Sequence, residues 1–148
     1  MNGVQSAIAS LRSTRVYDGR IVVTEEQVES WLNVARWCGS SKNSQPWRFA
    51  VVRDGYIRQV LAECGDHAKH LADAPVVIVI AALAYPHEFS SILDLGRVAQ
   101  SLMVSAHSEG VGSCIAVFEP EHDKVVRSVL HFPRHRGRCK HQTKAQRR

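Results

Sequence analysis

Apolar residues along the chain fall into two kinds of pattern, which predict helices alternating with strands. In some stretches they recur every three or four residues, as on one face of a helix, and in others they form short continuous runs. We expect helices over residues 4–11, 25–38, 56–64, 88–109 and 120–130, a helical turn over 66–72, and strands over 49–52, 76–80 and 113–117. The run 76–80 is continuously apolar and β-branched, which predicts a strand buried on both faces.

Local signals support the second and the longest of these helices. Thr24 and Gln27 have the spacing of a capping box, and Gly39 is a natural stop beyond the carboxyl end. In the longest helix an apolar stripe is expected to face the core, formed by Ile92, Leu95, Val98, Leu102 and Ala106. Both helices therefore offer one face for packing.

These elements indicate an α+β fold. The chain has 148 residues, which fits one domain. Only three strands are convincing, which is few for a stable sheet, and the long helices need partners. We therefore expect the domain to complete itself by dimerisation.

The charge divides the chain at Pro133. The net charge is +5, but seven of the 19 Lys and Arg residues lie in 134–148, which leaves 12 basic against 14 acidic residues elsewhere. We therefore expect a folded domain over residues 1–133 and a disordered basic tail over 134–148. Nucleic-acid binding through this tail is the alternative to a solvated extension.

Other global features restrict the class of protein. No apolar run reaches the roughly 18 residues of a membrane span, and no signal peptide is evident. Cys38, Cys64, Cys114 and Cys139 are widely spaced, as expected for reduced thiols. These features predict a cytoplasmic protein that does not bind membranes.

Three segments carry candidate chemistry. The loop 40–47 presents the donors of Ser41, Asn43 and Gln45, which suit a polar, phosphorylated small molecule but also an ordinary connection. The segment from Arg12 to Arg15 offers two guanidinium groups with hydroxyl groups between them, a donor set that matches phosphate oxygens. The alternative interpretation is a solvated surface turn. Gly110-Val-Gly112 permits close backbone approach, or simply caps a helix.

Taken together, residues 4–133 resemble the nitroreductase family of flavin enzymes. The resemblance is carried by residues 12–17 (RSTRVY), residues 40–49 (SSKNSQPWRF), Asp94-x-Gly96 with Ala99-Gln100-x-Leu102, and residues 110–113 (GVGS). The polar loop is the most specific of these motifs, and the glycine motif is supportive only.

The resemblance implies a dimeric α+β sandwich with a mixed sheet flanked by helices and one FMN in each of two interface sites. By motif, Arg12, Ser13 and Arg15 would hold the phosphate and ribityl chain. The polar loop would reach the flavin from the other subunit through Ser40, Ser41, Asn43 and Gln45. The backbone of Gly112 would lie close to the cofactor. NAD(P)H would then reduce a small acceptor, such as a nitroaromatic, quinone or enone, by a ping-pong mechanism. The cofactor carries that chemistry, so no catalytic side chain is expected.

The chain departs from the family pattern at three places. Leu11 stands where a basic residue is common, and Gly39 stands where a proline usually precedes the serine pair. After Pro133 the family continues into an extension that embraces the partner, whereas here a basic segment without apolar periodicity follows. We interpret this as a truncated or altered C-terminus, and the alternative function is an impaired or non-catalytic flavin-binding protein.

Two further sites are rival hypotheses. A metal site would use a cluster of ligand-type residues, namely Cys64, Asp66, His67, His70 and Asp73. A thiol nucleophile would pair Cys114 with His107 or His122. Surface-helix composition and a buried inert cysteine explain these residues more simply, so we expect no metal.

Overall fold

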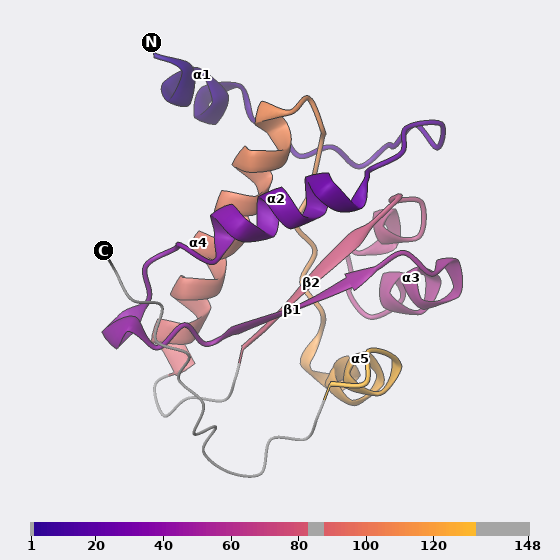
Figure 1. Ribbon diagram of the computed structural model, residues 1–148. Coiled ribbons are helices and arrows are strands. Elements are labelled where there is room, and N and C mark those ends of the chain that lie inside the picture. The colour runs from indigo at the N-terminus through magenta and orange to yellow at the C-terminus, as the bar shows by residue number, and fades with distance from the viewer. Residues whose placement is uncertain (1, 83–87, 133–148) are drawn as a thin grey trace.

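The structure is a computed structural model that describes residues 2–82 and 88–132. Its helices are α1 (Gly3–Ser10), α2 (Glu25–Ala35), α3 (Gly55–Ala62), α4 (Glu88–Ser108) and α5 (Asp123–Val129) (Figure 1). Its short 3₁₀ turns are η1 (Ser41–Asn43), η2 (Lys69–Leu71) and η3 (Pro120–His122). Its strands are β1 (Trp47–Val52) and β2 (Val77–Ala82). Each predicted helix is present, so the helical pattern is confirmed. The predicted tail 134–148 lies outside the described residues.

The two strands form an antiparallel ribbon at the centre of the described chain. Trp47 lies opposite Ala82 and Val52 opposite Val77. Helices α2 and α4 lie on one side of this ribbon, and α3 and α5 lie on the other (Figure 1). The α+β class is confirmed.

Each face of the ribbon has its own core. Val77 and Val79 pack with α3 and α5, whereas Ile78 and Ile80 pack with the core of α2 and α4. Successive side chains of a strand point to opposite faces. The strand therefore packs on both faces, as predicted, although Val77 and Val79 are buried and Ile78 and Ile80 are only partly buried.

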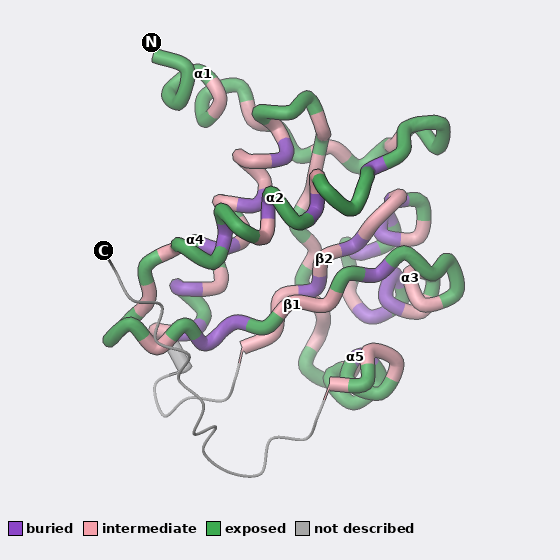
Figure 2. The backbone as a smooth tube through the Cα atoms, in the orientation of Figure 1, coloured by how far each residue is buried: buried purple, intermediate pink, exposed green. Residues whose placement is uncertain are grey.

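Helices α2 and α1 start in the same way but differ in burial. The Gln27 amide donates to Thr24 Oγ1 at 3.2 Å, and the Thr24 amide donates to Gln27 Oε1 at 3.1 Å, which confirms the capping box. Asn2 and Gln5 form an equivalent box on α1. However, α2 buries three side chains and α1 buries none, as the exposed colouring of α1 in Figure 2 shows. A cap starts a helix, whereas burial needs a neighbouring element.

Two sequence predictions are wrong. Residues 113–117 form no strand in the described chain: Ser113 makes a single parallel bridge to Ser13, and Ile115 and Val117 are exposed. An extended segment becomes a strand only where a neighbour continues the hydrogen bonding. Ile92, expected in the buried stripe of α4, is 63% exposed because that face of the helix has no neighbour in the described chain.

None of the described helices has the length and apolar character to cross a membrane.

Candidate functional site

The segment that holds Arg12 and Ser13 lies directly against Gly112 and Ser113. The Thr14 amide donates to the Ser113 carbonyl at 2.9 Å, and Ser13 bridges to Ser113 in parallel. A Cβ atom built on Gly112 would lie 2.6 Å from Thr14 Oγ1. Glycine is therefore needed here for close approach, which the sequence alone did not distinguish from a helix cap.

The basic side chains of this segment are exposed, and each has a defined neighbour. Arg12 Nη1 donates to the Ala9 carbonyl at 2.9 Å and to the Leu11 carbonyl at 2.8 Å, so it caps the carboxyl end of α1. The other nitrogens of its guanidinium still offer N–H donors, because arginine carries five.

Arg15 lies close to the phenol of Tyr17. Burial raises the pKa of Tyr17, the nearby Cys114 raises it further, and the positive charge of Arg15 lowers it in part. Arg15 thus places a positive charge near the half-buried hydroxyl of Tyr17. It is three residues along the chain from Arg12.

An unsatisfied hydroxyl marks the same place. Ser113 Oγ is buried, yet it has no hydrogen-bond partner among the described residues. A buried hydroxyl without a partner is costly. The neighbouring segment carries Arg12 and Arg15, so this hydroxyl, the arginines and Gly112 together offer the kind of donor set that a phosphate-bearing ligand requires.

Helix α1 is fixed to the carboxyl end of α4 by one side-chain contact. Ser10 Oγ and His107 Nε2 are 2.8 Å apart. Since Ser10 ends α1, this bond sets where Arg12 leaves the helix.

The polar loop has a different setting. Lys42, Asn43 and Gln45 have φ angles of 52°, 54° and 47°, a left-handed conformation that non-glycine residues seldom adopt. The loop is tied internally by the Gln45 amide, which donates to Ser40 Oγ at 2.8 Å. It is also tied to α4, because the Ser41 amide donates to Asp94 Oδ2 at 2.9 Å.

Arg97 covers the start of this loop. Its Nη2 lies 2.8 Å from the position that a Cβ of Gly39 would occupy. Its Nη1 lies 3.9 Å from Asp94 Oδ1. Gly39, which departs from the family pattern, therefore leaves room for the Arg97 side chain.

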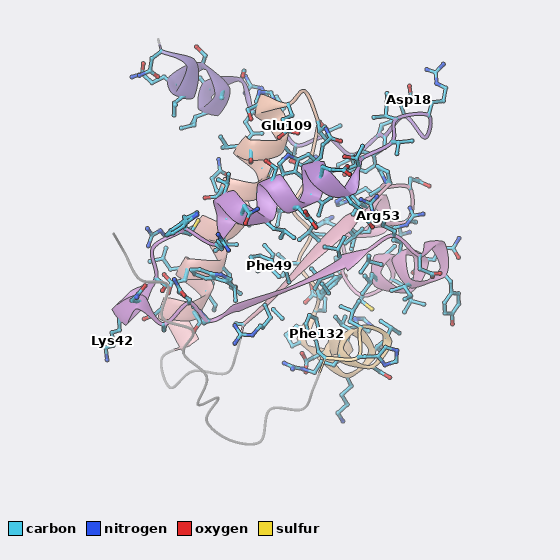
Figure 3. All side chains as sticks on the ribbon, in the orientation of Figure 1. Asp18, Lys42, Phe49, Arg53, Glu109 and Phe132 are labelled. Atoms are coloured by element: carbon cyan, nitrogen blue, oxygen red, sulfur yellow. The ribbon has the colours of Figure 1, made fainter. Side chains whose placement is uncertain are left out.

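The two groups of candidate residues lie at opposite ends of α4. Asp94 contacts the loop and His107 contacts α1, and the two residues are thirteen positions apart, which is about 20 Å of helix. Figure 3 shows the separation, with Lys42 at one end of α4 and Glu109 at the other. Arg12, Ser13, Arg15 and Gly112 form one group, and Ser40, Ser41, Asn43 and Gln45 form the other. A hollow of about 470 Å³ lies along the outer face of α2 and includes none of these residues.

The rival sites have little support in the described chain. No three His, Cys, Asp or Glu side chains in it are grouped so that they could hold a metal ion. The Cys114 thiol donates to the Ile115 carbonyl at 3.4 Å, and His107 is engaged by Ser10.

Sequence reasoning left Asp94, Arg97 and Ser113 out of the candidate site. For Asp94 a signal was present: it lies four residues before Val98 and eight before Leu102, so it occupies the buried stripe of α4. A carboxylate on a buried stripe requires a polar partner. Ser113 and Arg97 carried no comparable signal, because their contacts depend on distant segments.

Solved structures with this fold define the class of protein. A provisionally named NADH dehydrogenase/NAD(P)H nitroreductase from Parabacteroides distasonis matches with a TM-score of 0.80 and 26% identity, over 91% of this chain and 81% of that one. A provisionally named nitroreductase from Desulfovibrio desulfuricans, solved in complex with FMN, matches with a TM-score of 0.70 and 30% identity, over 76% and 66% of the two chains.

Sequence comparison assigns the family. Residues 8–69 and 62–139 match the model of the Nitroreductase family, and the chain belongs to this family. A provisionally named NADH dehydrogenase/NAD(P)H nitroreductase from Archaeoglobus fulgidus is 30% identical over 132 residues, which are 85% of this chain and 75% of that protein. The resemblance seen in the motifs is confirmed.

Proposed function

We propose that this protein is an FMN-dependent oxidoreductase that passes electrons from NAD(P)H to a small acceptor, such as a nitroaromatic, quinone or enone. Family membership and the FMN complex of a 30% identical neighbour support this proposal. The observation that carries it is the contact of Thr14 with Gly112, next to Ser113, whose buried hydroxyl has no partner among the described residues. Thr14 belongs to the segment that carries Arg12 and Arg15.

In this proposal the Arg12 segment and Gly112, which lie near the carboxyl end of α4, hold the phosphate end of the cofactor. Arg12 and Arg15 supply charged donors, Ser13 supplies a hydroxyl donor, and Gly112 lets backbone approach. Bound FMN would supply the hydride chemistry, and a ping-pong order follows if NAD(P)+ leaves before the acceptor binds. The chain itself binds and orients.

The polar loop acts on the cofactor of a second copy of the chain. Within one chain it lies about 20 Å along α4 from the Arg12 segment, so a homodimer is the arrangement that unites them. Exposed apolar side chains support this, namely Val4, Ile8, Trp37, Ile92 and Leu93. Covering such side chains stabilises an interface by about 25 cal/mol per Å² of buried apolar area.

The cysteines support a reducing, cytoplasmic compartment in this proposal. Cys38, Cys64 and Cys114 are free thiols. Burial raises the pKa of the Cys64 thiol, and the neighbouring Glu63 carboxylate raises it further. Such a thiol stays protonated and unreactive.

An absorbance spectrum of the purified full chain tests the proposal. The protein should be yellow, its flavin absorbance should fade when NADH or NADPH is added without oxygen, and a nitroaromatic or quinone should restore it. A colourless protein that fails to take up added FMN would refute the proposal. A size measurement on the same sample reports the dimer.

A further inference from the structure

We propose that Asp94 is the positioning residue of the polar loop, and that it sets FMN affinity from the far end of α4 through one hydrogen bond to the Ser41 backbone. This inference rests on the proposed function, because it concerns the loop that would face the flavin of the second copy. The carboxylate acts through the loop and need not touch the cofactor.

The carboxylate of Asp94 is buried on α4. Asp94 is only 3% exposed, although it stands in line with the apolar residues Val98 and Leu102 on the buried stripe of α4. Removing a carboxylate from water costs several kcal/mol unless it is paired and hydrogen-bonded. Its short contact is with the Ser41 amide at 2.9 Å, so the burial of this charge is coupled to the position of the loop.

The backbone of the loop is strained. Lys42, Asn43 and Gln45 all have positive φ angles. Asparagine tolerates this conformation, but Lys42 and Gln45 each cost about 1–2 kcal/mol relative to an ordinary conformation, and such strain persists only where the surroundings hold it. Within the loop, the Gln45 amide donates to Ser40 Oγ, and two further backbone hydrogen bonds run from Asn43 to Ser40 and from Ser44 to Ser41. The hydrogen bond from Ser41 to Asp94 ties the loop to α4, so its loss should free the first half of the loop from that helix.

Asp94 contacts Arg97 much less closely than it contacts the Ser41 amide. Arg97, the cation nearest to Asp94, is 3.9 Å from Oδ1 and its side chain is 54% exposed. Although Asp94 is buried, the 3.9 Å separation is long for an ion pair, and water screens the exposed Arg97 guanidinium, so the pair contributes little. The acceptor oxygen facing Ser41 should therefore matter more than the negative charge. Asparagine keeps an acceptor oxygen and the same shape, so Asp94→Asn should preserve the loop where Asp94→Ala does not.

The experiment compares three variants of the full chain. Asp94→Ala removes the acceptor, and Asp94→Asn keeps it. Asp54→Ala is the matched control, since Asp54 Oδ1 also accepts a backbone N–H at 2.9 Å, from Ile57 at the start of α3. Two readouts are used: FMN dissociation constants from flavin fluorescence, and hydrogen exchange of the Ser41 amide in flavin-free protein.

Asp94→Ala should weaken FMN binding by about tenfold or more, the effect of one lost hydrogen bond to a charged group. It should also expose the Ser41 amide to fast exchange. Asp94→Asn should bind FMN within about threefold of the wild type and keep slow exchange of the Ser41 amide, because it keeps the acceptor oxygen. If the negative charge were essential, this variant would bind FMN as weakly as Asp94→Ala. Asp54→Ala should change neither readout at the loop.

Ser41→Pro is a second route that spares the buried residue. Proline removes the N–H donor, and it is tolerated at the first position of a helical turn after an extended residue such as Ser40, with φ −135° and ψ 159°. It should weaken FMN binding as much as Asp94→Ala does, even if the latter folds poorly. Ser41→Ala, which removes the hydroxyl but keeps the N–H, should weaken binding less; an equal loss in Ser41→Ala would assign the effect to the hydroxyl.

The outcomes are distinguishable. If the wild type binds FMN and Asp94→Ala binds it equally well, the inference is wrong and the proposed function stands. If Asp94→Asn is as damaging as Asp94→Ala, the hydrogen-bond mechanism is wrong. If the wild type takes up no FMN, the proposed function fails together with the affinity claim, and the exchange of the Ser41 amide decides the positioning claim alone.

Discussion

The side chain of Thr14 lies against the backbone of Gly112, where a Cβ atom would come within 2.6 Å of Oγ1, 2.9 Å of Cβ and 3.0 Å of Cγ2. The Thr14 amide is held to the neighbouring Ser113 carbonyl at 2.9 Å. Because this hydrogen bond limits how far Thr14 can withdraw, the contact fixes the Arg12 segment to the end of α4.

Gly112→Ala should therefore destabilise the fold by about 1–3 kcal/mol, the cost of overpacking a close contact. Urea unfolding measures it. Gly96→Ala is the control: Gly96 lies within α4 and a Cβ there would meet nothing within 4 Å, so alanine should be neutral or stabilising by up to about 1 kcal/mol. Equal stability of Gly112→Ala and the wild type would contradict the close approach.

Arg12→Ala should weaken FMN retention by about tenfold, because a charge-assisted donor to phosphate is lost. Arg53→Ala is the matched control, since Arg53 Nη1 also donates to a backbone carbonyl, that of Val23 at 2.7 Å, but Arg53 follows β1 and is not part of the Arg12 segment. Fluorescence titration with FMN measures both variants. Equal effects would undermine the assignment of the phosphate to Arg12.

Leu93→Arg should shift the protein from dimer to monomer and reduce its flavin content. Leu93 is 59% exposed on α4, beside the exposed Ile92, and a charge placed there cannot be buried in an interface. Size-exclusion chromatography with light scattering gives the mass. Tyr56→Arg, on an exposed position of α3, is the control and should leave the mass unchanged. A dimer retained by Leu93→Arg would place the interface elsewhere.

Tyr17 should make stability fall with pH in the alkaline range. Burial raises the pKa of Tyr17 above its usual value of 10.0, so the folded state favours the neutral phenol. This contribution is fully present below pH 10 and is lost as the pH rises through the folded pKa. Unfolding free energies between pH 9 and 11 should decline less in Tyr17→Phe than in the wild type. Tyr56→Phe controls for the loss of one tyrosine, and equal slopes for the two variants would contradict the prediction.

Local signals determined most of the secondary structure. Thr24 and Gln27 start α2 because their side chains reach only three residues along the chain. The alternation of Val77 and Ile78 between two cores follows from the pleat of a single strand. The motifs also indicated the family, since Arg12, Ser41 and Gly112 are identifiable without knowing their neighbours.

Tertiary structure decided the features that need two distant segments. Residues 113–117 have the pattern of a strand, yet among the described residues Ser113 alone forms a bridge to another segment, so no ladder forms there. Ile92 fits a buried stripe but faces away from the described core. Asp94 reaches Ser41 across 53 residues of sequence. Sequence periodicity specifies which face of an element is apolar, but only the folded chain specifies what that face meets, because hydrogen bonds and burial belong to pairs of segments rather than to one.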